Sequence, residues 1–137
     1  MMTISEVGLT LPATPASLTV VRQVLSGMGD ACGWDAAFLS DVKLAVSEAC
    51  ANVVVHAYGS EVGEIDVHSV IADGQLVTRI RDSGGGITPT IAGDDSAGVG
   101  MALMVSVADL VAIRSGSDTG TTIELSFNLP LNDHAST

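Results

Sequence analysis

The sequence predicts an α/β domain, an α+β two-layer sandwich in which helices cover one face of a mixed or antiparallel β-sheet. The order of the expected elements is the first observation, because strands flank a helix pair and then return as hairpins. Composition is the second observation: 137 residues is the usual length of one domain, and 47% of them are hydrophobic, enough to fill a core without disulfides or metals. We therefore expect one domain over residues 1–131 and a frayed C-terminal tail over residues 132–137.

The N-terminal part is expected to form a strand and then a helix. Residues 4–11 alternate weakly between apolar and polar side chains, which suggests the strand. Thr14 and Pro15 form a helix start, with Thr as the N-cap and Pro at the first helical position. Several glycines interrupt the pattern afterwards, so we expect this helix to end near Met28.

A second helix is expected to begin after Asp35 and to stop at Gly59, with apolar residues along one stripe. Glu48, Asn52 and His56 follow one another at intervals of four, so they share one side of this helix. A carboxylate and an amide at that spacing can hold a metal ion and act as a base, but a solvated polar stripe has the same spacing. Small and apolar neighbours favour partial burial, and a covered glutamate needs a partner.

The C-terminal part is expected to form two hairpins. Asp73-Gly74 is a strong hairpin signal between the first two strands. The stretch over residues 82–100 is rich in Gly, Asp and Ser and predicts a long loop. The expected elements are strands over residues 64–71 and 76–81, a helix over residues 101–108, and strands over residues 110–114 and 122–129.

Two glycine clusters frame the expected loop. Asp82 directly follows a strand and precedes Gly84 and Gly86, and glycines let a backbone approach a ligand closely. An ionised aspartate only accepts hydrogen bonds, which suits an exocyclic amine such as that of adenine; a flexible turn is the alternative. Gly98 and Gly100 precede the next expected helix, where free backbone N–H groups favour anions such as phosphate.

The charge of the chain excludes several classes of partner. Five Lys and Arg residues face 16 Asp and Glu residues, and the formal net charge is −11. Such a chain should repel nucleic acid and anionic membranes, whereas its acidic surface serves solubility or meets a basic protein. No signal peptide or membrane span is apparent, so we expect a cytoplasmic protein. Cys32 and Cys50 form no metal-binding motif and are expected to be buried thiols.

In this order and at this spacing, the three clusters resemble the ATP-binding domain shared by gyrase, Hsp90, histidine kinases and MutL. Within that superfamily the chain is most similar to the stand-alone anti-sigma factor serine/threonine kinases of bacteria. The resemblance implies a Bergerat-type ATP-binding fold, whose mixed β-sheet carries helices on one face. The matching stretches are LAVSEACANVVVHAYG (Leu44–Gly59), RDSGGGI (Arg81–Ile87), AGVGMALM (Ala97–Met104) and GTTIEL (Gly120–Leu125).

The resemblance implies a role for each matched residue around ATP. Glu48 would orient or deprotonate the attacking nucleophile, and Asn52 would bind the Mg²⁺ that bridges the phosphates. Asp82 would accept a hydrogen bond from the adenine amino group. Gly84 and Gly86 would make room for the base and for the lid of the site.

Four further residues complete the implied site. Gly98 and Gly100 would bring backbone N–H groups to the phosphates, and Thr121 would support the adenine site by hydrogen bonding. Arg22 on the first helix would contact a partner protein, although an ordinary exposed arginine is an equal alternative. His56 matches a residue common in these kinases, and we assign it no role.

The implied function is phosphorylation, with Mg-ATP, of a serine or threonine on an antagonist (anti-anti-sigma) protein, combined with sequestration of a sigma factor. Relatives of this kind often form homodimers. Two alternatives stay open. One is a non-catalytic nucleotide-binding module that regulates by partner exchange, and the other is a detached histidine-kinase-type catalytic domain whose substrate histidine a separate partner supplies.

One departure from the family pattern concerns the lid. Relatives often carry basic residues just before the second glycine pair, whereas this chain has Gly93-Asp94-Asp95-Ser96-Ala97. No Lys or Arg occurs between Arg81 and Arg114. The departure leaves ATP binding intact and predicts weak phosphoryl transfer.

Overall fold

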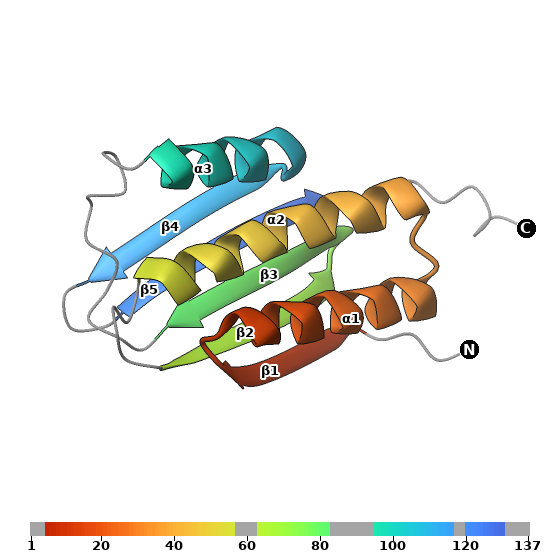
Figure 1. The fold of residues 1–137 in the computed structure, drawn as a ribbon. Helices are drawn as coiled ribbons and strands as arrows, with labels where there is room; N and C mark the ends of the chain where they lie inside the picture. The colour runs from red at the N-terminus through yellow and green to blue at the C-terminus, as the bar shows by residue number, and fades with distance from the viewer. Residues whose placement is uncertain (1–4, 57–62, 83–94, 117–119, 131–137) are drawn as a thin grey trace, which may run out of the picture.

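Three helices lie on one face of a five-stranded sheet in this computed structural model, which describes residues 5–56, 63–82, 95–116 and 120–130 (Figure 1). The predicted fold class, a two-layer α/β sandwich with helices on one face, is confirmed. In chain order the elements are β1 (Glu6–Pro12), α1 (Pro15–Cys32), α2 (Ala36–His56), β2 (Glu64–Ala72), β3 (Gln75–Asp82), α3 (Asp95–Val107), β4 (Leu110–Gly116) and β5 (Gly120–Asn128).

The strand order of the sheet is β1-β2-β3-β5-β4, and all four strand pairings are antiparallel. Of the two sheet types expected, the antiparallel one is found and the mixed one is wrong. The reason is the position of β5. β3 and β4 run in the same direction, but the last strand lies between them and pairs antiparallel with both.

The turn between β2 and β3 sets the register of the sheet. Asp73 and Gly74 both have positive φ, 55° and 75°, as a type I′ hairpin turn requires, so this prediction is confirmed. The register that follows pairs Asp82 with Ile65 across the two strands. Because side chains alternate along a strand, Asp82 points to the helix-covered face together with the buried Ile80.

Helix α1 begins where the sequence predicts and ends later than expected. Thr14 is extended, with φ −129° and ψ 157°, and Pro15 takes the first helical position, but no side-chain hydrogen bond caps the helix. Gly27 and Gly29 lie inside the helix, which continues to Cys32, so the expected end near residue 28 is wrong. A glycine inside a helix costs only about 1 kcal/mol, and the burial of one face of α1 outweighs that cost.

Helix α2 begins with the predicted cap. One carboxylate oxygen of Asp35 accepts a hydrogen bond of 2.7 Å from the backbone N–H of Phe38, the third residue of the helix. The predicted apolar stripe is buried, and Val42, Val46 and Val53 are fully inaccessible to solvent. The expected stop at Gly59 lies outside the described residues.

Helix α3 corrects the prediction for residues 82–100. We expected a loop up to Gly100 and a helix from Met101, but α3 begins at Asp95. The two glycines suggested a loop because glycine weakens an isolated helix. Here α3 packs against α2 and β4 and buries Met104 completely, so tertiary packing outweighs local propensity (Figure 1).

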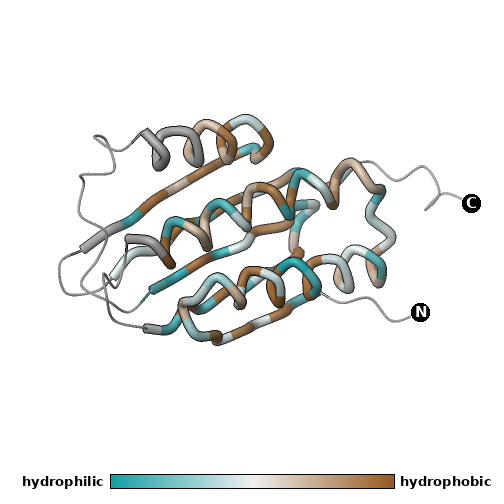
Figure 2. Tube along the Cα trace, in the orientation of Figure 1, coloured by the Kyte–Doolittle hydropathy of each residue, from teal (hydrophilic) through white to brown (hydrophobic). Residues whose placement is uncertain are grey.

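The core lies between the helices and the sheet. Figure 2 shows hydrophobic and hydrophilic residues alternating along α1 and α2, as expected of helices with one buried face. Three of the few aromatic residues meet edge to face, with ring centroids 5.2 Å apart for Trp34 and Phe38 and 6.2 Å apart for Phe38 and Phe127. The remaining core consists of aliphatic side chains, as the composition predicts.

Two expectations concern the chain as a whole. In the part of the chain that the structure describes, no helix is both long and apolar enough to cross a membrane. The expected tail over residues 132–137 lies outside the described residues and stays a prediction.

The stability of the fold should depend on the interior strand β5. Replacing the fully buried Leu125 with Ala should lower the free energy of unfolding by about 2–5 kcal/mol, because it leaves a cavity between sheet and helices. The matched change Leu110→Ala, at a side chain that is 58% exposed on the neighbouring strand, should change it by about 0.5 kcal/mol or less. Denaturant titration measures both, and equal losses would contradict this account of the core.

Candidate functional site

Several element ends meet at one end of the molecule. The C-terminal ends of α2 and β3 and the N-terminal end of α3 lie there together (Figure 1). The strand register adds the start of β5 and the end of β4, since Arg81 pairs with Thr122 and Gly116 pairs with Gly120. Ends of strands and helices expose backbone groups that can bind a ligand, so this end is the candidate site.

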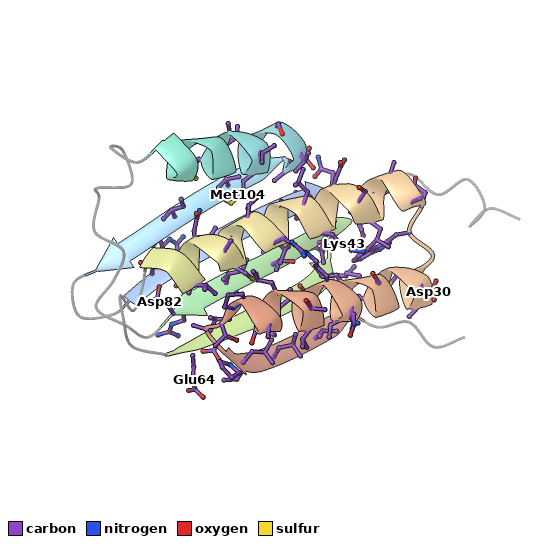
Figure 3. The ribbon with its side chains drawn as sticks, viewed as in Figure 1. Asp30, Lys43, Glu64, Asp82 and Met104 are labelled. Atoms are coloured by element: carbon purple, nitrogen blue, oxygen red, sulfur yellow. The ribbon has the colours of Figure 1, made fainter. Side chains whose placement is uncertain are left out.

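Asp82 is a buried carboxylate at this end of the sheet. It is 1% exposed, and one of its oxygens accepts a 3.1 Å hydrogen bond from the backbone N–H of Thr121, which is itself fully buried. Figure 3 shows Asp82 at the end of β3, near the C-terminal part of α2. A buried carboxylate requires hydrogen-bond donors, and the N–H of Thr121 is one of them. Asp82 and Thr121, which the resemblance assigns separately to the adenine site, are therefore in contact.

Gly120 is a site residue that the sequence prediction missed. Its φ is +76°, and a side chain there would collide with the backbone carbonyl oxygen of Asp82 and lie 3.0 Å from one of its carboxylate oxygens. Only a residue without a Cβ lets β5 pass this close to Asp82. The matching stretch GTTIEL begins with this glycine, but the resemblance implies a role only for Thr121.

Glu48 and Asn52 lie one turn apart on α2, and both are half-buried, as predicted. The intervening Cys50 is fully buried, and burial raises the pKa of its thiol to about 12, with a smaller opposing effect of Arg22. Ala49 and Val53, which directly follow Glu48 and Asn52, are fully buried, so the half-buried Glu48 and Asn52 lie at the margin of the buried face. From that margin their oxygens can reach a ligand.

Cys32 and Cys50 are both free thiols. Cys50 is buried as predicted, whereas Cys32 is only half-buried. A thiol with a pKa near 12 stays protonated at neutral pH, and this makes Cys50 a packing residue.

Arg22 is exposed on α1, but it is not free. Its Nε donates a 2.9 Å hydrogen bond to the hydroxyl of Ser47, a buried residue of α2 that directly precedes Glu48. The bond ties the outer surface of α1 to the turn of α2 that carries Glu48.

The structure describes only two of the four glycines that were predicted to contact the nucleotide. Gly84 and Gly86 lie outside the described residues, as does the side chain of His56. Gly98 and Gly100 do not precede the helix as expected, because they lie within the first two turns of α3. The free N–H groups at the start of a helix belong to its first turn, so in this conformation they come from the residues before Gly98.

The residues present fit a magnesium ion held mainly by a nucleotide. Within the described residues, no group of three His, Cys, Asp or Glu side chains is placed to hold a metal. Mg²⁺ is usually bound by one or two side-chain oxygens together with phosphates and waters. The amide oxygen of the half-buried Asn52 matches that need.

Comparison with known proteins shows the family to which the chain belongs. Residues 11–127 match the family described as Histidine kinase-like ATPase domain. The match spans most of the chain, and the chain therefore belongs to this family of ATP-using domains.

Individual relatives show which kind of ATP-using protein the chain is similar to. The chain is 30% identical over 149 residues to the serine-protein kinase RsbW of Bacillus velezensis, across 98% of this chain and 93% of that protein. It is 29% identical to the RsbW of Bacillus subtilis, across 93% of this chain and 89% of that protein. These relatives confirm the prediction of an ATP-binding serine/threonine-protein kinase of the anti-sigma factor type, and they do not favour either alternative.

Solved structures agree on the fold. The structure of the RsbU and RsbW domains of Rv1364c from Mycobacterium tuberculosis has a TM-score of 0.76 and 26% identity, and the match covers 94% of this chain and 34% of that longer chain. A blue-light activated histidine kinase from Erythrobacter litoralis EL346 has a TM-score of 0.63 at 18% identity, which shows the fold alone.

The candidate site should require a residue without a Cβ at position 120. Gly120→Ala should weaken ATP binding by about tenfold or more, because the new methyl group displaces Asp82. Gly74→Ala is the matched control: its φ is +75°, and nothing lies within 4 Å of the added Cβ. The control should lose about 1–2 kcal/mol of stability and keep its ATP affinity. Calorimetric titration with an ATP analogue at a temperature where both variants are folded is the test, and equal affinities would contradict the role of Gly120.

Proposed function

We propose that the chain binds Mg-ATP beside Asp82 and transfers the γ-phosphoryl group to a serine or threonine of an antagonist, an anti-anti-sigma protein. The chain would also sequester a sigma factor in the cytoplasm until the antagonist protein releases that factor. The observation that carries the proposal is the buried Asp82 carboxylate, held by the N–H of Thr121 next to the helix of Glu48 and Asn52. The similarity to RsbW kinases supports the same reading.

Asp82 would recognise the adenine. Its carboxylate is buried and accepts a hydrogen bond from the N–H of Thr121, and an ionised carboxylate has about four acceptor positions in all. The exocyclic amino group of adenine is a neutral donor of the required kind. Thr121 would support the same edge of the base with its hydroxyl, and Gly84 and Gly86 would leave space for the ring.

Glu48 and Asn52 would carry the chemistry. Glu48 would accept the proton of the attacking hydroxyl or orient that hydroxyl in line with the γ-phosphoryl group. Asn52 would contribute its amide oxygen to the Mg²⁺, which neutralises charge on the phosphates when it is bound. Their common position on one side of α2 would hold both side chains in a constant relation to Asp82.

Gly98 and Gly100 would donate backbone N–H groups to the phosphates under one condition. In the structure both residues lie inside α3, where an amide is normally bonded to the carbonyl four residues before it. We therefore propose that nucleotide binding unwinds the first turn of α3 and releases these amides. The glycines suit that change, because they lower the stability of the helix.

Arg22 would contact a partner protein. It is exposed, and its bond to Ser47 links it to the turn of α2 that carries Glu48. A partner that displaces this bond would change the support of the proposed base. Binding at the outer surface of α1 and phosphoryl transfer would then be coupled.

Phosphoryl transfer is proposed to be slow without a basic group from the partner. No Lys or Arg occurs between Arg81 and Arg114, so the lid carries none. An arginine at a transferring phosphoryl group accelerates transfer by about 10³–10⁵, whereas a helix N-terminus supplies only about 0.3–1 kcal/mol in exposed settings. The partner's own surface would have to provide the missing charge.

Asp82→Asn should weaken ATP binding about tenfold or more, because the amide presents a donor to the adenine amino group. The control is Asp109→Asn, whose carboxylate also accepts a backbone N–H, at 2.7 Å from Asn128, but lies at the opposite end of β5. Its affinity for ATP should match the parent. Calorimetric titration checks both variants, and unchanged affinity in Asp82→Asn contradicts the adenine role.

Glu48→Gln should keep ATP binding and lower the phosphorylation rate by about 10²–10⁴, the usual contribution of a general base. Glu64→Gln, at an exposed strand residue, is the matched control and should keep the parent rate. The assay uses labelled ATP and candidate antagonist proteins from neighbouring genes. A parental rate in Glu48→Gln rejects the base assignment. If the parent binds ATP but labels none of these proteins, the partner assignment fails while the nucleotide site stands.

A further inference from the structure

The face of the sheet that the helices leave open carries most of the positive charge of this protein. Three of its five basic residues, Arg79, Arg81 and Arg114, line one hollow of about 370 Å³ there. The three arginines come from β3 and β4, and the residues between them come from β5. Figure 1 shows all three helices on the other face of the same sheet.

The strand register places two of these arginines on one row. Arg81 of β3 and Arg114 of β4 are both paired with Thr122 of β5, so they flank this threonine from either side. Neighbouring strands lie about 4.8 Å apart, and the two arginine backbones are therefore roughly 10 Å apart. Both side chains are exposed and long enough to converge on one ligand above Thr122.

The carboxylates around the hollow are already engaged. Glu124 accepts a 2.6 Å hydrogen bond from Nε of Arg79, and Asp66 accepts one of 2.7 Å from the hydroxyl of Thr10. At the edge of the same face, Glu6 lies 2.6 Å from a ring nitrogen of His68.

Arg81 and Arg114 differ from Arg79 in their partners. Neither forms an ion pair within the part of the chain that the structure describes. Cross-strand pairs of opposite charge stabilise a sheet, and like charges close together destabilise it. Here a neutral threonine separates two positive charges, and an anion bound between them would relieve their repulsion.

The position of this charge is unusual for the protein. With 16 acidic residues and a net charge of −11, the chain as a whole repels acidic partners. The other two basic residues, Arg22 and Lys43, lie on the helices of the opposite layer. Three of the five basic residues therefore line this hollow, together with two acidic residues, Asp66 and Glu124.

We propose that this hollow docks an acidic segment of a partner protein. Its carboxylates would bind the guanidinium groups of Arg81 and Arg114, whose planar donors match a carboxylate in pairs. The hydroxyl of Thr122 would donate between them. A volume of about 370 Å³ falls within the range of ligand sites and suits two or three side chains.

The docking site is separate from the nucleotide site. Arg81 and Asp82 are consecutive residues of β3, and their side chains point to opposite faces of the sheet. An acidic segment and Mg-ATP can therefore bind at the same time. The docking proposal does not depend on the proposed kinase partners.

A labelled short polyglutamate peptide is the probe, and fluorescence anisotropy at low salt measures its affinity for the full chain. Arg81→Gln and Arg114→Gln should each weaken binding by roughly tenfold, because each removes charge-assisted hydrogen bonds. Lys43→Gln removes the same charge from the helical layer and should leave the affinity at the parent value. Saturating Mg-ATP should not displace the peptide, and the variant Asp82→Asn should bind it normally.

Backbone amide NMR of the parent protein with the same peptide locates the site. The largest shift changes should fall on Arg81, Thr122 and Arg114. The proposal is overturned if Lys43→Gln loses as much affinity as the arginine variants, if Mg-ATP competes, or if an uncharged peptide of the same length binds equally. It is also overturned if inorganic phosphate displaces the peptide at a similar concentration, since the hollow would then be a site for small anions.

Discussion

The close approach of two backbones, β5 at Gly120 and β3 at Asp82, sets the geometry of the candidate site. A side chain at residue 120 would overlap the Asp82 carbonyl, so the contact exists only because that residue is glycine. The approach brings the N–H of Thr121 to the Asp82 carboxylate and keeps both residues out of solvent. The acceptor is thus positioned by main chain from two strands, which is more rigid than support by neighbouring side chains.

Helix α2 connects this end of the sheet to the core. Side chains that fill the core and side chains of the candidate site follow one another along the same turns, since Ala49 and Cys50 are fully buried between Glu48 and Asn52. Packing against the sheet therefore fixes the rotation of the helix about its axis. That rotation decides where the carboxylate of Glu48 lies, so the precision of the site comes from apolar burial.

The sequence predicted best what short-range chemistry decides. The Asp35 cap and the Asp73-Gly74 turn appear as expected, because a cap or a two-residue turn is specified by adjacent residues. The start of α3 was missed, because packing against α2 outweighed two glycines. The insertion of β5 between β3 and β4 could not be predicted either, since it depends on contacts between distant segments.

The candidate site also contains residues that the sequence reveals and residues that only the folded structure reveals. Glu48, Asn52, Asp82 and Thr121 could be found from motif spacing and resemblance, and the structure brings Asp82 and Thr121 into contact. Gly120 and the Ser47 partner of Arg22 could not, because each depends on a distance across the fold. The basic row on the open face was equally hidden, since Arg81, Thr122 and Arg114 are adjacent only in the sheet.

The position of β5 also has a consequence for synthesis of the protein. The strand that pairs with both β3 and β4 is the last of the five in chain order. When only the residues before Gly120 have emerged from the ribosome, β3 and β4 each have an edge without a partner strand. The apolar face of α2 then lacks part of its cover. Such unpaired edges attract other chains, so the growing polypeptide is most exposed to aggregation just before its final strand emerges.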